Sequence, residues 1–148
     1  MCDCQDGSTA LMEASAKNSS AVGQLLAKGA DVNARDKFGW TALMYATDSV
    51  TKDSADVVGQ LLAKGAHVNV RNKDGMTALM YASWEGNAKV VKQLLAHGAD
   101  VTMEDMDGWA ALEYAENRHP PRHEGHVEVA EQLLVEIDAH AFRKLKRW

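Results

Sequence analysis

Histidines near the C-terminal end are the residues whose type and spacing suggest metal chemistry. His119, His123 and His126 fall within eight residues, and Glu124 lies between them. Imidazole nitrogens and a carboxylate oxygen are ligands that zinc accepts, so the cluster raises a zinc-site hypothesis. The only two cysteines, Cys2 and Cys4, lie two residues apart at the other end of the sequence. They could bind a soft metal, but no second ligand pair accompanies them. We favour a chain without a bound metal or other cofactor.

Recognisable catalytic motifs are missing from the sequence. It contains no Gly-x-Gly-x-x-Gly, no phosphate-binding loop ending in Gly-Lys-Ser or Gly-Lys-Thr, and no nucleophile elbow. The formal net charge of −5 disfavours a duplex nucleic-acid binder, which needs a basic face. The chain has no run of about 18 apolar residues, and its first residues lack the basic and apolar regions of a signal peptide. We therefore expect a cytoplasmic protein that is not an enzyme and does not span a membrane.

The last seven residues, Phe142 to Trp148, combine four basic side chains with two aromatic ones. Such a cluster could contact an anionic membrane surface or a nucleic acid. Basic residues also suit the C-terminal end of a helix, where they compensate the helix dipole. In a chain of negative net charge we prefer this second explanation.

The remaining chemistry is recognition, and it depends on a repeated stretch. The residues from Lys73 to Ala82 read Lys-Asp-Gly-Met-Thr-Ala-Leu-Met-Tyr-Ala, and related stretches occur three more times. Their equivalent positions Thr9, Thr41, Thr77 and Ala110 are 32, 36 and 33 residues apart. A period near 33 residues is typical of a stacked repeat array.

Each repeat predicts two short helices. A Gly-x-Thr turn starts the first helix, because glycine accepts a positive φ and threonine is a good N-cap. The first helices are expected near 10–17, 42–48, 78–85 and 111–117. The motif Val-x-Gln-Leu-Leu marks the second helices, which are expected to end at Gly29, Gly65 and Gly98. Helices this short are marginal alone, so their stability depends on stacking against neighbouring repeats.

The two ends of the array are expected to differ. At the C-terminal end, a longer helix should cap the stack. The predicted buried stripe of this helix consists of Val127, Ala130, Leu134, Ile137, Ala141 and Leu145. At the other end, residues 1–5 are too short to cap the first repeat. Part of its apolar face should therefore be exposed and could allow self-association.

Together these motifs resemble the ankyrin repeat. Gly-x-Thr-x-Leu, the Val-Val-x-x-Leu-Leu helix and the Gly-Ala-Asp-Val-Asn turn recur in fixed order over about residues 6–137. The resemblance implies an all-α solenoid with β-hairpin-like turns, in a single domain over 1–148. Its repeats would lie near 4–35, 36–71, 72–104 and 105–148. It also implies a structural role for His126, because Gly125-His126 matches the Gly-His that precedes the second helix in the family.

The chain departs from the family where each first helix begins. The usual Thr-Pro-Leu-His is here Thr-Ala-Leu-Met. Proline would pre-organise the helix start, and the family's histidine ties neighbouring loops by hydrogen bonds. Ala42, Ala78, Met44 and Met80 are expected to do neither. We therefore expect intact repeats with looser turns.

In the family, partner-binding residues lie at the turn tips, just after the turn glycine, and late in the first helix, along a concave groove. Trp40, Trp84 and Trp109 fall at such positions, and large apolar side chains that face solvent favour a binding surface. A competing explanation is that Trp40 and Trp109 pack on adjacent turns and stiffen the stack. The candidate partner-binding residues are Arg35, Lys37, Phe38, Trp40, Arg71, Lys73, Asp74, Met76, Trp84, Glu104, Met106, Asp107, Trp109 and Arg118.

A protein or peptide partner is the favoured ligand, and the chain would act as an adaptor, an inhibitor or an antitoxin-like sequestering protein. Basic residues in the middle of the groove and acidic residues in its C-terminal part suit a partner with an acidic segment beside a basic one. Two alternatives stay open. A planar ligand such as a nucleotide could stack on Trp40 and Trp109, with Arg35 or Arg71 on its phosphates. The chain could also be a purely structural or designed scaffold.

Overall fold

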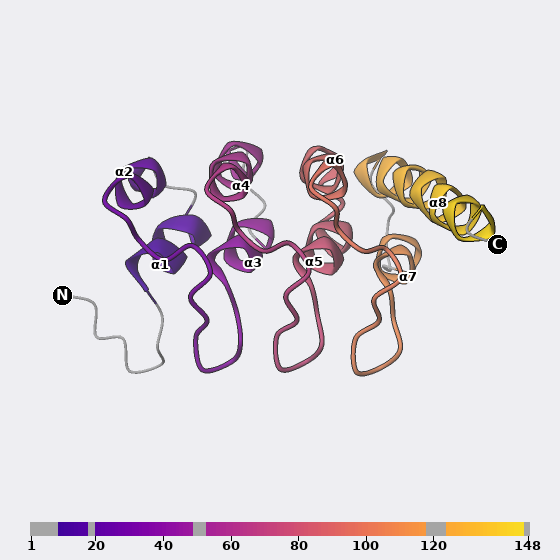
Figure 1. Cartoon of the computed structure of the whole chain (residues 1–148), viewed down its shortest axis with the longest axis horizontal. Helices are drawn as coiled ribbons and strands as arrows, with labels where there is room; N and C mark the ends of the chain where they lie inside the picture. The colour runs from indigo at the N-terminus through magenta and orange to yellow at the C-terminus, as the bar shows by residue number, and fades with distance from the viewer. Residues whose placement is uncertain (1–8, 18–19, 49–52, 118–123, 147–148) are drawn as a thin grey trace.

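Eight helices in two rows make up the architecture in the part of the chain that the structure describes. This computed structural model describes residues 9–17, 20–48, 53–117 and 124–146. The first helix of each repeat lies beside the long turns, and the second helix lies farther from them (Figure 1). The helices are α1 (Ala10–Ala16), α2 (Ala21–Ala27), α3 (Ala42–Thr47), α4 (Ser54–Ala63), α5 (Ala78–Glu85), α6 (Ala88–Ala96), α7 (Ala111–Glu116) and α8 (Glu124–Leu145). The expected all-α repeat solenoid is thus confirmed.

The first helices begin where the sequence predicts, at threonine caps. The Oγ1 atoms of Thr9, Thr41 and Thr77 accept hydrogen bonds from backbone amides three residues later. The methionine side chains close two of these caps from the other side. The Sδ atoms of Met12 and Met80 each lie 3.4 Å from the cap amide that donates to them. Met80 therefore has a capping role that the sequence analysis did not assign to it.

Hydrogen bonds between repeats hold neighbouring turns together. The amide of Lys73 donates to the carbonyl oxygen of Phe38 at 3.0 Å, and the amide of Met106 donates to that of Asp74 at 3.1 Å. Asn33 adds a side-chain link, because its amide group donates to the Gly65 carbonyl and accepts from the next repeat. Backbone and asparagine bonds thus link neighbouring repeats. That the turns are looser than those of the family stays a prediction.

The core is a layer of aliphatic side chains between the two rows. Leu43 and Leu79 from first helices, and Val58, Leu61 and Leu94 from second helices, are at most 1% exposed. Each second helix also contacts the second helix of the next repeat, so burial continues along the stack.

The C-terminal helix α8 caps the stack, and the predicted stripe is only partly right. Ala130 and Ile137 of that stripe pack against the core, whereas Ala141 is exposed. Its buried residues are His126, Val129 and Leu133. Val127, Leu134 and Leu145, which the spacing placed inside, are 47%, 45% and 73% exposed. The reason is that α8 packs against α5, α6 and α7 together, which turns His126 inward and sets the buried face one residue earlier.

The first repeat does not expose the apolar face that was expected. Leu11, Met12 and Val22 are at most 1% exposed, and Leu26 is buried too. Among the described residues, the large exposed apolar side chains all lie in later repeats. The proposed route to self-association through repeat one therefore loses its physical basis.

Two glycines allow α8 to approach the turn between α5 and α6. Gly86 ends α5 in the left-handed region, at a φ of 69°. A Cβ atom added to Gly125 would lie 2.2 Å from the carbonyl oxygen of Gly86. His126 is buried against the same turn, and its Nε2 lies 2.9 Å from the carbonyl oxygen of Trp84. His126 thus has the structural role that the resemblance implies.

Replacing Gly125 by alanine should destabilise the protein by about 1–3 kcal/mol, because the new methyl group would meet rigid backbone. Gly59→Ala in α4 is the matched control. Its Cβ would make only an ordinary 3.6 Å contact with Gln93, and alanine should stabilise this helix by up to about 1 kcal/mol. Urea unfolding followed by circular dichroism measures both changes. Equal stability of the two variants would contradict the close approach of α8.

Candidate partner-binding surface

Three turns of the same shape form the surface that carries most of the candidate residues. In each turn, one buried residue closes the loop: Asp36, Asn72 or Asp105. Its Oδ1 atom accepts hydrogen bonds from the backbone amides two and four residues later, over 2.9 to 3.0 Å. This arrangement fixes each turn from inside, and the residues directly after the closing residue project outward. We call this surface, formed by residues 35–40, 71–76 and 104–109 with the C-terminal ends of α3, α5 and α7, the turn face.

Tyrosines connect each turn to the first helix of its repeat. The hydroxyl of Tyr45 donates to Oδ2 of Asp36 at 2.6 Å, and that of Tyr114 donates to Oδ2 of Asp105. In the third repeat the direction is reversed, because Asn72 donates its Nδ2 hydrogen to the hydroxyl of Tyr81 at 2.8 Å. These closing residues were not among the candidates predicted from the sequence. The signal for them was an Asp or Asn nine residues before each tyrosine.

These bonds shift the acidity of the groups involved. Burial alone would raise the pKa of Asp105, but hydrogen bonds from the Tyr114 hydroxyl and from the amides of Trp109, Asp107 and Gly108 outweigh it and lower the pKa below 3.8. Burial, with the adjacent Asp105 carboxylate, raises the pKa of Tyr114. Burial also raises the pKa of Tyr81 to about 12. The turn is therefore most stable with a charged Asp105 and a neutral Tyr114.

Most of the candidate residues lie exposed on the turn face, as expected. The exposed ones are Arg35, Lys37, Phe38, Arg71, Lys73, Asp74, Trp84, Glu104, Met106, Asp107 and Trp109. Trp40 and Met76 differ, because both are half-buried and pack against the core. Arg118, His119 and His123 lie outside the described residues.

Trp40 has a packing role that the sequence analysis held as the competing explanation. Its ring centroid lies 5.0 Å from that of Tyr45 and 4.6 Å from that of Tyr81 in the next repeat. Contact with tyrosine rings of two repeats makes Trp40 part of the stack. Trp109 also packs on a tyrosine, with its centroid 5.5 Å from that of Tyr114, but it remains 39% exposed.

Two candidate arginines also hold the turns together. The Nη2 atom of Arg35 donates to the carbonyl oxygen of Arg71 at 2.5 Å, while its Nε donates within its own turn. Arg71 repeats the pattern and donates from Nη2 to the carbonyl oxygen of Glu104 at 2.8 Å. Among the described residues of the turn face, the exposed cations without a hydrogen bond to a backbone carbonyl oxygen are Lys37 and Lys73.

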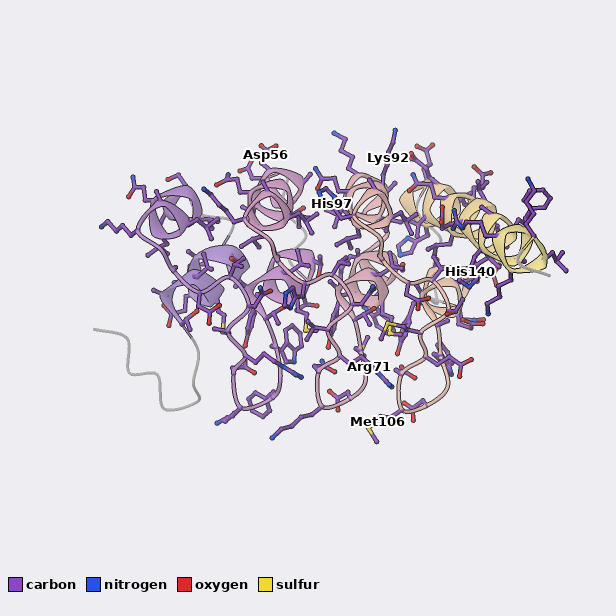
Figure 2. The ribbon with its side chains drawn as sticks, viewed as in Figure 1. Asp56, Arg71, Lys92, His97, Met106 and His140 are labelled. Carbon is purple, nitrogen blue, oxygen red and sulfur yellow. The ribbon has the colours of Figure 1, made fainter. Side chains whose placement is uncertain are left out.

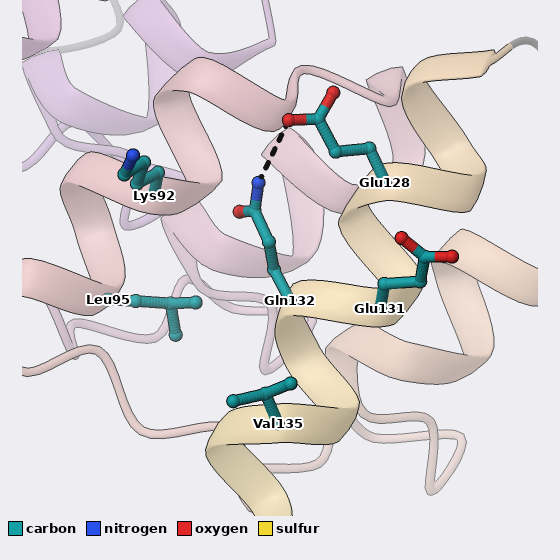
Figure 3. A pocket seen from close by; sticks show the side chains of 6 residues that line it. All are labelled: Lys92, Leu95, Glu128, Glu131, Gln132 and Val135. Atoms are coloured by element: carbon teal, nitrogen blue, oxygen red, sulfur yellow. Dashed lines mark hydrogen bonds between the residues drawn. The ribbon is translucent and has the colours of Figure 1, made fainter.

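A second concave region lies on the other row of helices. Lys92 and Leu95 of α6, with Glu128, Gln132 and Val135 of α8, are among the side chains around it (Figure 3). Its volume is about 410 Å³. Gln132 donates to Glu128 across one helical turn at 3.4 Å. None of the candidate residues from the sequence analysis lies in this region.

Neither a metal cluster nor a membrane span is found in the described ranges. Over residues 9–17, 20–48, 53–117 and 124–146, no three His, Cys, Asp or Glu side chains are grouped to hold a metal ion. None of the helices in these ranges combines the length and apolar character that crossing a bilayer requires.

The shifted pKa of Asp105 predicts a pH-dependent contribution to stability. The pKa of Asp105 is lower in the folded protein than its ordinary value of 3.8. The stabilisation is therefore complete at pH values well above 3.8, and it is lost as the pH falls through the pKa of the folded state. Asp105→Asn, which introduces the residue of the third repeat, should cost about 1 kcal/mol at pH 7. The difference from wild type should shrink towards pH 2.

Urea unfolding of both proteins from pH 7 to pH 2 measures this difference. Asp107→Asn, an exposed change in the same turn, controls for the change in net charge. A stability difference that stays constant or grows towards acid pH would contradict the role given to the Asp105 carboxylate.

Comparison with known proteins agrees with this geometry. The chain matches a family model described as ankyrin repeats (3 copies) over residues 1–72 and 48–143. A stretch of 38 residues is 63% identical to the mitochondrial disaggregase of Bos taurus, and it covers 25% of this chain but 6% of that protein. This chain therefore resembles only a small part of that relative. The family match, with the paired helices and projecting turns, shows that the chain belongs to the ankyrin-repeat family.

Proposed function

We propose that the turn face binds a protein or peptide partner and that the chain acts through recognition alone, without catalysis. Ankyrin repeats generally mediate protein–protein interactions, which makes this the first expectation for the family. An adaptor, an inhibitor and a sequestering, antitoxin-like protein would all use the surface in this way.

The observation that carries the proposal is the set of large apolar side chains exposed on the turn face. Phe38 and Met106 stand at turn tips and are 51% and 76% exposed. Trp84 and Trp109 are exposed on the same face. Aromatic and methionine side chains in such positions are typical of interface hot spots. Phe38 and Met106 lie outside the core, so the packing of the stack does not depend on their side chains.

The rigidity of the turns supports the same conclusion. Closing residues, tyrosines and arginines fix each turn before a partner arrives. A preorganised surface loses less conformational entropy on binding, so more of the contact energy contributes to affinity. By contrast, stacking of a planar ligand on Trp40 has less support, because two tyrosines already contact its ring.

Charge along the turn face suggests how a partner would be oriented. Lys37 is exposed in the turn at 35–40, and Lys73 is exposed beside Asp74 in the turn at 71–76. In the turn of the fourth repeat, at 104–109, Glu104 and Asp107 are exposed. A partner with an acidic segment near the second turn and a basic segment near the fourth would be electrostatically complementary.

Replacing Phe38 and Met106 by serine together should abolish partner binding without unfolding the protein. Met106 lies at a turn tip, far from Asp56 and Lys92 on the second helices (Figure 2). Asp56→Ala with Lys92→Ala is therefore the matched control, because it changes the same number of exposed residues on the other side. Affinity capture from a native lysate followed by mass spectrometry compares the three proteins. A partner that the serine variant retains and the control variant loses would place binding on the second helices instead.

A further inference from the structure

We propose that a small aromatic pocket on the turn face receives a basic side chain, lysine or arginine, of the partner. The pocket is lined by Asp48, Met76, Tyr81, Trp84 and Tyr114 and has a volume of about 240 Å³. Its lining comes from three successive repeats, so it exists only in the stacked array. The inference rests on the proposed function, since it names the chemistry of one contact on the same surface.

Aromatic rings make up most of the pocket wall. Tyr81, Trp84 and Tyr114 all line it, and the ring centroids of Trp84 and Tyr114 lie 5.6 Å apart in an edge-to-face arrangement. Both tyrosines are held in place through their hydroxyls, by Asn72 and Asp105. Fixed aromatic rings around a small space attract a cation through their electron-rich faces.

The carboxylate of Asp48 gives the pocket its charge. Asp48 is the C-cap residue of α3, where the helix dipole disfavours a negative group. No cation of the described chain forms an ion pair with it, and partial burial raises its pKa. The position is therefore unfavourable for the free protein alone. A cation from a partner would relieve this unfavourable electrostatic energy.

The surroundings of the pocket are also acidic. Asp74 from the third turn acts electrostatically on Tyr81, and Asp107 from the fourth turn acts on Tyr114. Arg71, a cation in the same turn as Met76, is bound to the carbonyl oxygens of Gly75 and Glu104. Among the described residues, the charges that act on Tyr81 and Tyr114 are carboxylates, which suits a basic ligand and disfavours an acidic one.

The size of the pocket favours a side chain over a whole small molecule. Ligand sites for small molecules usually have volumes of roughly 300–1,000 Å³. At about 240 Å³, this pocket suits one long side chain whose backbone lies outside, along the turn face. The aliphatic part of lysine or arginine could contact Met76 while the charged end reaches Asp48.

Single amino-acid probes test the inference without a known partner. Nα-acetyl-lysine amide, Nα-acetyl-arginine amide and the neutral Nα-acetyl-norleucine amide are titrated into the ¹⁵N-labelled full chain. Nuclear magnetic resonance follows the indole signal of Trp84 and the backbone amides of Asp48 and Met76. At least one basic probe should bind at these residues about fivefold more tightly than norleucine amide, because only the basic probes have the cation. Equal affinity for all three probes would overturn the inference.

Asp48→Asn removes the charge while keeping the shape of the side chain, and it should weaken the basic probes about fivefold, to the level of norleucine amide. Asp56→Asn, an exposed change on α4, is the control and should have no effect. Thermal unfolding checks that both variants remain folded. The comparison of the basic probes with norleucine amide uses the unsubstituted protein, so it holds even if a variant fails to fold. If Asp48→Asn changes neither probe binding nor lysate capture while Phe38→Ser with Met106→Ser abolishes capture, the pocket inference fails and the proposed function stands.

Discussion

One oxygen atom in each turn determines the geometry of the recognition surface. Oδ1 of Asp36, Asn72 or Asp105 accepts hydrogen bonds from two backbone amides inside the partly buried turn. Leaving such an amide without a partner costs up to about 1–3 kcal/mol, so few side chains can replace these acceptors. The second polar atom of the same side chain is bonded to a tyrosine of the first helix. Through this pair of bonds, the core of each repeat determines where its turn tip lies.

The same design explains why residues with unlike roles stand side by side in the turns. Lys37, Phe38 and Met106 follow the closing residue and are exposed. Folding therefore does not restrict which side chains stand there, and they can contact a partner. Trp40 and Met76 come directly after the turn glycine, where the chain enters the helix, and they return towards the core. In the second and third repeats, a separation of two residues therefore distinguishes a side chain that can contact a partner from one that supports the stack. Trp109, at the equivalent position of the fourth repeat, does both, because it packs on Tyr114 and remains 39% exposed.

Much of the fold could be predicted from the sequence, because each helix start has a local signal. Thr9, Thr41 and Thr77 cap the helices as their type and position indicate. The buried stripe of α8 could not be found from helical spacing alone, since Val127, Leu134 and Leu145 show that spacing too. Alignment with Val90 and Leu94 of the preceding second helix points instead to Val129 and Leu133, which are buried. The closing residues were not predicted, because their burial and their bond to the tyrosine nine residues later form only when the turn packs on the first helix.

The arginine bonds between turns also have a direction. Each runs from one repeat to the backbone of the next, from Arg35 to Arg71 and from Arg71 to Glu104. The equivalent position in the fourth turn is a glutamate, which has no donor to continue the series. The series of arginine bonds therefore repeats through the middle of the array and ends at Glu104. An additional copy of residues 36–71 inserted after residue 71 would find a matching donor on one side and a matching acceptor on the other, whereas a copy added beyond the fourth turn would find neither.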